Sequence, residues 1–268
     1  MRISGFALVN IAIAAVVAAG IALQAGLFDG GGSSSRASTP AESTLPIHPG
    51  PTGCTHALVY ASDGSPSRNE VALSFDDGPT ANTEQLVNIL LRYHATATFF
   101  LIGDQVKGNE HLLRAMNGDG MELANHSYTH PADLATEGPG ATRQLEMTNT
   151  AIRDATGFKP CLFRPPFGAL TPDLVERAKQ LGMTTAKWRV DSSDYLHPGT
   201  AVITQRVLDG VRPGDIVVMH DNPETRGQTV AALPGILQGL QSRGYRVVNI
   251  STLLGQWFTG APKAPGSP

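Results

Sequence analysis

The stretch Ser74-Phe75-Asp76-Asp77-Gly78-Pro79 follows an apolar run and places two adjacent carboxylates at the end of an expected strand. Neighbouring side chains of a strand point to opposite faces, so both carboxylates can serve one site only if the strand is interrupted. The Gly-Pro pair is expected to interrupt it, because proline cannot continue a ladder of hydrogen bonds. One carboxylate then suits a metal ion and the other suits proton transfer. An isolated Asp-Asp-Gly-Pro is more often a turn or a helix cap, so its partners must decide.

Apolar runs alternate with segments of helical periodicity on both sides of this stretch. Strands are expected at 71–75, 97–102, 121–124, 162–163, 183–190, 216–219 and 245–250. Helices are expected around 86–93, 110–116, 141–155, 173–181, 201–208 and 233–240. This alternation predicts an α/β fold with a parallel sheet. Polar motifs repeatedly follow a strand, which is where barrel enzymes place their active sites.

The length and charge of the chain exclude some classes of function. The 268 residues have a net charge of −3 and a pI near 6.2, so nucleic acid is not an expected partner. One folded domain is expected over 54–260, preceded by a Gly/Ser/Pro-rich flexible linker at 29–53 and followed by a disordered tail at 261–268. A monomer is expected.

The N-terminal segment has the character of an export signal. No charged residue occurs between Ile3 and Phe28, and this run is long enough to span a bilayer. Residues 1–28 are therefore expected to be a membrane anchor or a cleaved signal peptide, with the anchor slightly favoured. Either one makes the rest of the chain extracytoplasmic, membrane-anchored or secreted.

The only two cysteines are Cys54 and Cys161. In an exported protein they are candidates for one disulfide that closes a long loop. Two free, buried thiols are the alternative.

Two histidines supply the first partners of the acidic stretch. His126 and His130 lie four residues apart, a spacing at which both rings converge on one face of a helix or within a tight loop. Most histidine pairs at this spacing bind no metal. With Asp77 as a third ligand, however, the set leaves coordination positions open for water and substrate, as in a catalytic zinc site. Such an ion polarises a carbonyl and makes its water more acidic.

Further polar residues follow other strands. Asp76 is the candidate general base and His220 the candidate general acid, although a histidine after an apolar run is more often structural. Arg164 can orient Asp76 by bidentate hydrogen bonding, or form an ordinary surface ion pair. Asp191 and Asp194 are candidates for orienting Arg164 or His220, with solvated loop carboxylates as the alternative.

Five motifs occur in one order: SFDDGP, HSYTH, RPPFG, DSSDY and VMH. The chain resembles, over about 71–250, the polysaccharide deacetylases, which share the NodB-homology domain of carbohydrate esterase family 4. This resemblance implies a distorted (β/α) barrel and a divalent metal, usually Zn²⁺, with Co²⁺ or another divalent ion as the alternative. It also implies removal of N- or O-acetyl groups from polysaccharides.

The resemblance also assigns roles to individual residues. It makes Asp76 the base, His220 the acid and Arg164 the residue that orients Asp76. The metal ligands become Asp77, His126 and His130. The backbone N–H of Phe167 is expected to hold the oxyanion, and Tyr195 to form part of the acetyl pocket.

Four positions depart from the family pattern. The motifs have Ser74 where threonine is usual, Tyr195 for tryptophan and Val218 for leucine, and Met121 replaces a common histidine. None of them removes a proposed ligand, acid or base, so an active enzyme is expected. The expected activity is removal of N-acetyl groups from N-acetylhexosamine units of a peptidoglycan-like or chitin-like polysaccharide. An acetylxylan-type O-deacetylase and a non-catalytic glycan-binding protein are the alternatives.

Overall fold

A computed structural model of the protein describes residues 53–54, 58–222, 227–256 and 258–259, with the backbone alone for the first and last pairs. The chain divides into two units, 1–43 and 44–268, and the described residues belong to the second. The predicted anchor or signal, almost all of the linker and the tail lie outside the described residues. Among the described helices, none has the length and apolar character needed to cross a membrane.

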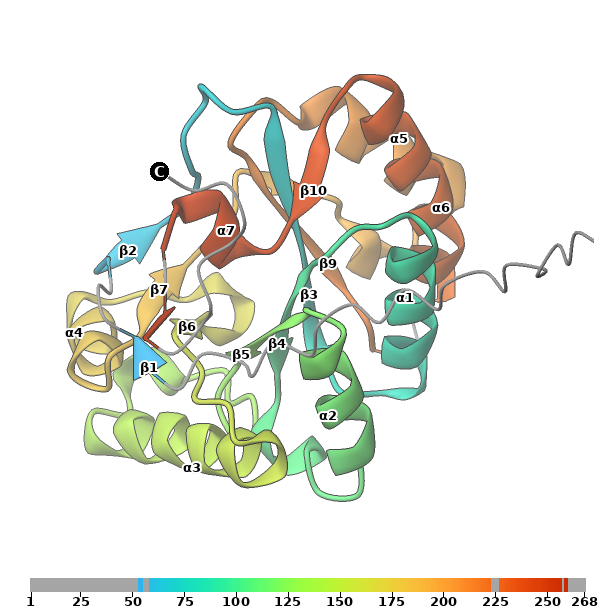
Figure 1. Ribbon diagram of the computed structural model, residues 1–268. Helices are drawn as coiled ribbons and strands as arrows, with labels where there is room; N and C mark the ends of the chain where they lie inside the picture. The colour runs from blue at the N-terminus through green and yellow to red at the C-terminus, as the bar shows by residue number, and fades with distance from the viewer. Residues whose placement is uncertain (1–52, 55–57, 223–226, 257, 260–268) are drawn as a thin grey trace, which may run out of the picture. The chain divides into compact units, whose positions relative to one another are not determined.

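The central element is a sheet of nine strands in which every pairing is parallel (Figure 1). Eight strands form a path in the order β2-β7-β6-β5-β4-β3-β9-β8, and β10 pairs with β3. Their bounds are β2 (Tyr60–Ala61), β3 (Glu70–Gly78), β4 (Thr98–Leu101), β5 (Glu122–Asn125), β6 (Leu162–Phe163), β7 (Thr184–Ala186), β8 (Val190–Asp191), β9 (Ile216–His220) and β10 (Arg246–Val248). The predicted parallel sheet is confirmed.

The connection from β7 to β8 links the strand beside the end strand β2 to the strand at the other end of the sheet. β7 pairs with β6 and β2, whereas β8 pairs with β9 at the opposite end of the path. Only residues 187–189 separate the two strands, so the chain itself closes the curled sheet. The predicted distorted (β/α) barrel is confirmed. The prediction of a single strand over 183–190 is wrong. Lys187 N–H donates to the carbonyl oxygen of Ala61 in β2, whereas Arg189 N–H donates to that of Ile216 in β9, on the other side of the sheet.

Helices cover the outside of the strands (Figure 1). Their bounds are α1 (Ala81–Arg92), α2 (Glu110–Gly118), α3 (Pro139–Thr156), α4 (Pro172–Gln180), α5 (Thr200–Gly210), α6 (Gly227–Ser242) and α7 (Ile250–Leu254). The last predicted strand ends too late, since Asn249 caps α7 by accepting a hydrogen bond from Thr252 N–H. Four 3₁₀ turns span Gly103–Gln105, Leu134–Thr136, Pro166–Gly168 and Asp194–Leu196.

Alternation along β3 decides which side chains enter the barrel. Leu73 and Phe75 belong to the large core between the sheet and the helices, and Phe75 stacks on Phe99 at 5.1 Å. Ala72 belongs to a smaller cluster on the other face of the strand. Because side chains alternate with a period of two, Asp76 follows Ala72 into the interior of the barrel.

A two-stranded antiparallel ribbon lies outside the barrel sheet. It pairs β1 (Gly53–Cys54) with β11 (Phe258–Thr259), so regular structure begins at the last residue assigned to the linker. Cys161 is buried and disulfide-bonded. The side chain of Cys54 lies outside the described residues, so its pairing with Cys161 stays a prediction.

Candidate active site

A β-bulge at Asp77 brings the two adjacent carboxylates to one site. The register between β3 and β4 shifts between Asp76 and Gly78, and Asp77 has a φ of 77°. The extra residue turns Asp77 out of the alternation, so its side chain no longer faces away from that of Asp76. The strand continues to Gly78, and the predicted interruption by the Gly-Pro pair is therefore one residue too late.

Gly78 has a different function in the structure. A Cβ atom at this position would lie 2.5 Å from a carboxylate oxygen of Asp221. Any larger residue here would therefore require the buried side chain of Asp221 to move.

The two histidines lie in a loop that follows β5. Ser127 and His130 have positive φ values of 68° and 55°, so the segment is a folded loop and not a helix. Ser127 Oγ accepts a hydrogen bond from His130 N–H at 3.1 Å. The side chain of Gln144 on α3 accepts the N–H groups of Tyr128 and Thr129, each at 2.9 Å. These bonds hold the backbone of the loop that carries both rings.

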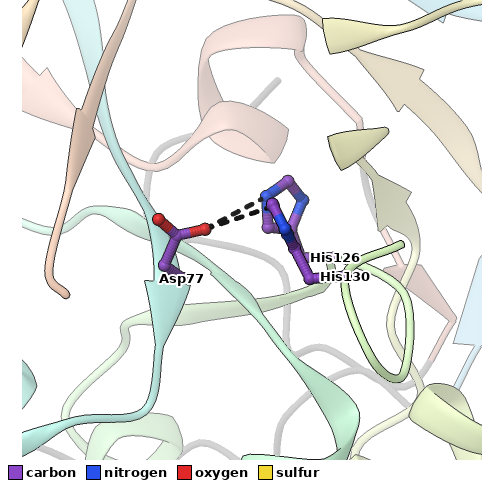
Figure 2. A group of neighbouring side chains, drawn as sticks. All are labelled: Asp77, His126 and His130. Carbon is purple, nitrogen blue, oxygen red and sulfur yellow. Dashed lines mark ion pairs between the residues drawn. The ribbon is translucent and has the colours of Figure 1, made fainter. Parts of the chain in front are cut away.

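Asp77, His126 and His130 converge as Figure 2 shows. Their ligand atoms lie within 4.8 Å of one another. Asp77 Oδ1 is 3.6 Å from His126 Nε2 and 3.4 Å from His130 Nε2. Two imidazoles and one carboxylate at this spacing fit a single divalent ion with open coordination positions.

The surroundings of His126 support that fit. Its Nδ1 donates to the carbonyl oxygen of Arg164 at 2.7 Å, which leaves Nε2 as the free lone pair on the side of Asp77. Burial lowers the pKa of His126 to about 3, so the ring is neutral, the form that binds metals.

Arg164 holds the other carboxylate, Asp76. Arg164 is fully buried at the end of β6, and its Nη1 donates to Asp76 Oδ1 at 2.6 Å and to Ser74 Oγ at 2.9 Å. Its other nitrogens donate to the carbonyl oxygens of Ala186 and Lys187, each at 3.2 Å. The alternative of a surface ion pair is wrong, because the side chain of Arg164 is 0% exposed and that of Asp76 is 5% exposed.

His220 and Asp194 form a second buried pair across the site. Asp194 Oδ1 accepts from His220 Nδ1 at 2.7 Å, and Asp194 Oδ2 accepts from His220 N–H at 2.8 Å and from Thr229 Oγ1 at 2.6 Å. Burial lowers the pKa of His220, but the hydrogen bond and charge of Asp194 outweigh it and raise the pKa. Burial alone would raise the pKa of Asp194, but the hydrogen bonds that its carboxylate accepts outweigh burial, so the pKa is lowered.

Phe167 lies in the short turn Pro166–Gly168 with a φ of 55°. Within the described part of the chain, its backbone N–H has no hydrogen-bond acceptor. An amide in this state is free to donate to a group that enters the pocket.

The proposed base, acid, metal ligands and oxyanion donor line one pocket of about 390 Å³. It is lined by Asp76, Asp77, His126, His130, Phe167, Gly168, Trp188, Asp191, Tyr195, Val218 and His220. The ring of Tyr195 packs edge-on against His220, with centroids 5.7 Å apart. Asp191 accepts a hydrogen bond from Ser193 N–H at 2.7 Å and orients neither Arg164 nor His220, so that part of the prediction is not met.

Sequence reasoning missed three residues of the site. Trp188 lines the pocket, Thr229 supports Asp194, and Asp221 is buried behind Gly78. Burial raises the pKa of Asp221 to about 7, with Thr83 as the hydrogen-bond donor to its carboxylate. Its position directly after His220 was the one available signal.

Comparison with known proteins agrees with this geometry. Residues 63–186 match the family model described as polysaccharide deacetylase. A peptidoglycan-N-acetylglucosamine deacetylase of Bacillus cereus is 36% identical over 69% of this chain and 87% of its own length. A chitooligosaccharide deacetylase of Rhizobium leguminosarum bv. trifolii is 34% identical over 70% and 93%.

A solved structure gives the same fold. It is a carbohydrate esterase family 4 pseudoenzyme from Bacillus anthracis, 34% identical, with a TM-score of 0.66 over 72% of this chain and 68% of that one. With the barrel, the five motifs and these relatives in agreement, the chain belongs to the polysaccharide deacetylase family, carbohydrate esterase family 4.

Proposed function

We propose that this protein is a metal-dependent hydrolase that removes N-acetyl groups from N-acetylhexosamine units of a cell-wall or extracellular polysaccharide. One observation carries the proposal. Asp76, which is held by Arg164, and His220, which is held by Asp194, line the same 390 Å³ pocket as the ligand group of Asp77, His126 and His130. A hydrolase of amides needs a base, an acid and an electrophile around one carbonyl.

A divalent ion, with Zn²⁺ as first choice and Co²⁺ as the alternative, would be held by Asp77, His126 and His130. When bound, it supplies positive charge that polarises a carbonyl and makes water more acidic. Asp76 accepts the proton of the water that attacks the acetyl carbon. Arg164 fixes the orientation of Asp76 for this step through its hydrogen bond at 2.6 Å.

The acid side completes the reaction. The free N–H of Phe167 donates to the carbonyl oxygen as negative charge develops on it. His220 presents Nε2 to the pocket, because its Nδ1 is held by Asp194. As the C–N bond breaks, His220 transfers its proton to the nitrogen, which leaves as an amine, and acetate is the second product.

The relatives support an aminosugar substrate. The names of the Bacillus cereus and Rhizobium leguminosarum proteins specify peptidoglycan N-acetylglucosamine and chitooligosaccharides. Acetylxylan-type O-deacetylation needs the same groups and remains the second enzymatic candidate. A non-catalytic glycan-binding protein is the third, and one relative of similar identity is a pseudoenzyme. The complete set of acid, base and ligands in this chain argues against that third reading.

The proposal includes the place of action. An extracytoplasmic enzyme, anchored or released after the uncharged segment 3–28 and acting as a monomer, is consistent with a polysaccharide substrate outside the cell. Export is tested by the fractionation of full-length protein between membrane, medium and cytosol.

The activity is tested by acetate release from peptidoglycan, chitin oligomers and acetylated xylan, with and without chelator. We expect release from an N-acetylated glycan, loss of release on chelation and recovery on adding Zn²⁺ or Co²⁺. Asp76→Ala, His126→Ala and His220→Ala should abolish release and leave the fold intact. Full activity and full metal content in Asp77→Ala and His130→Ala would refute the ligand assignment.

A further inference from the structure

Lys187 is a charged residue inside the barrel closure that the proposed mechanism does not use. It follows β7 directly, and its Nζ donates to the carbonyl oxygen of Gly168 at 2.8 Å. The same ammonium lies 4.2 Å from the centre of the Trp188 ring. It therefore reaches from the closure of the barrel to the turn that carries Phe167.

That turn needs external support. Phe167 and Gly168 have consecutive positive φ values of 55° and 67°. A phenylalanine in this region is strained, and such a conformation persists only where neighbouring groups hold it. Gly168 N–H and Ala169 N–H bond back to Pro165 and Pro166 at 3.0 Å each, which fixes the turn internally. The bond from Lys187 ties the turn to the barrel closure by a hydrogen bond, while the ring of Phe167 packs edge-on against His130 at 4.7 Å.

Lys187 and Trp188 lie so close to Gly168 that no space remains for a side chain at this position. A Cβ atom at Gly168 would collide with Lys187 Nζ and would lie 2.8 Å from Trp188. The carbonyl oxygen of Lys187 also accepts a hydrogen bond from Nη2 of Arg164 at 3.2 Å. Lys187 thus makes two contacts within the site. Its backbone carbonyl contacts Arg164, which holds Asp76, and its side chain contacts the turn that carries the free amide of Phe167.

A partly buried ammonium beside Arg164 is energetically unfavourable, so space-filling alone does not explain a lysine at this position. Burial lowers the pKa of Lys187, and the nearby charge of Arg164 lowers it further. A methionine would fill the space beside Trp188 without bringing a second cation toward Arg164. The features that the ammonium adds are the hydrogen bond to the carbonyl of Gly168 and the contact with the Trp188 ring.

We propose that Lys187 is a positioning residue for the reaction: its ammonium fixes the Gly168 carbonyl and thereby aims the Phe167 N–H at the oxyanion. This inference rests on the proposed function. Small displacements of such a donor cost about 10²-fold in rate. We expect Lys187→Met to lower kcat by about tenfold to a hundredfold and to leave KM for the glycan within about twofold. Lys187→Arg, which keeps a charged donor, should recover most of the loss.

Three controls separate positioning from structural support. Lys179→Met removes an exposed lysine whose partner is Glu176, and its kcat should equal that of the wild type. The melting temperature of Lys187→Met should stay within a few degrees of the wild type. Gly168→Ala disrupts the same contact from its other side, so the double variant should lose less than the product of the two single losses.

Hydrogen exchange tests the contact without any need for activity. In a peptide covering 165–169 only Phe167, Gly168 and Ala169 carry exchangeable amides, because prolines have none. We expect faster exchange of this peptide in Lys187→Met than in the wild type and in Lys179→Met. If Lys187→Met does not fold, Lys187→Gln repeats both measurements with a shorter neutral donor.

The outcomes are distinct. Unchanged kcat in Lys187→Met, or losses that multiply with Gly168→Ala, would overturn the inference, and so would unchanged exchange at 165–169. If the wild type released no acetate from any glycan, the proposed function would fail. Faster exchange would then still support the control of this turn by Lys187, and unchanged exchange would still refute it.

Discussion

Replacing Asp194 with asparagine tests the acid side of the site most directly. The carboxylate is fully buried and accepts three hydrogen bonds, two of them from His220. An asparagine of the same shape can keep its oxygen on the His220 N–H and Thr229. Its NH₂ group then faces His220 Nδ1, where a protonated nitrogen has no acceptor. The substitution therefore disfavours the imidazolium while leaving the packing unchanged.

The size of the effect follows from the bond that is lost. A hydrogen bond to a charged partner contributes about 1.5–3 kcal/mol, which corresponds to a roughly tenfold to hundredfold smaller population of protonated His220. In the wild type the pKa of His220 is raised, so the acid form survives to higher pH. In Asp194→Asn the alkaline limb of the pH–rate profile should move to lower pH. The deficit in kcat/KM should thus be small near pH 5.5 and grow as the pH rises.

The stability of the two proteins should diverge in a defined pH window. The raised pKa of His220 stabilises the fold below its unfolded value of about 6.5 and ceases to do so as the pH passes its folded value. The lowered pKa of Asp194 stabilises the fold above about 3.9, and this contribution disappears as the pH falls through its folded value. The loss of unfolding free energy in Asp194→Asn should be largest between these limits.

The assay is acetate release between pH 5 and 9 with urea unfolding at matched pH values. Asp173→Asn is the matched control, because it removes an exposed partner of Arg177 and should cost no more than about 0.5 kcal/mol. A parallel loss of rate at every pH in Asp194→Asn would refute the reasoning, since the deficit would then not come from the protonation of His220.

Three further perturbations test other parts of the site. Arg164→Met leaves the Asp76 carboxylate buried without its cation and should lower the unfolding free energy by about 3–5 kcal/mol in urea titration; a loss under 1 kcal/mol would contradict the buried pair. Asp191→Asn should leave the alkaline limb of the pH–rate profile in place, because Asp191 accepts from Ser193 and does not contact His220; a shift would restore Asp191 to an orienting role. In chelated protein, the pKa of Asp221 at about 7 means that the unfolding free energy of the wild type falls as the pH rises from about 4 to about 7. Asp221→Asn lacks this loss, so its stability relative to the wild type should be greater at pH 8 than at pH 5, by a few kcal/mol in urea titration. The same difference at both pH values would contradict the buried, protonated carboxyl.

The elements of the barrel could be predicted because each has a local signal. Apolar runs such as 98–101 and 216–219 become buried parallel strands, and the helical spacing of Leu86, Leu90 and their neighbours becomes the buried face of α1. The division of 183–190 into β7 and β8 has no such signal. It depends on which sheet end each half meets, and periodicity does not contain that information.

The site shows the same division between local and long-range information. The motifs identify Asp76, Asp77 and the two histidines because each lies at the end of a strand or in the loop that follows it. They do not reveal that the register shift falls at Asp77, since a bulge adds a residue without changing the composition. The contacts of Trp188 and Lys187 with the turn at Gly168 join residues 19 or 20 positions apart in segments that follow different strands, and no motif marks these contacts.

Arg164 and the residues that follow it connect several groups of the site to one strand end. The carbonyl of Arg164 orients His126, its guanidinium orients Asp76, and Phe167 three positions on supplies the free amide. A proposed metal ligand, the proposed base and the proposed oxyanion donor are therefore positioned from the end of the single strand β6. Displacement of that strand end moves all three together, so their mutual geometry is preserved. His220, the proposed acid, is held separately by Asp194, which also accepts a hydrogen bond from Thr229, so we expect that its protonation can be perturbed alone.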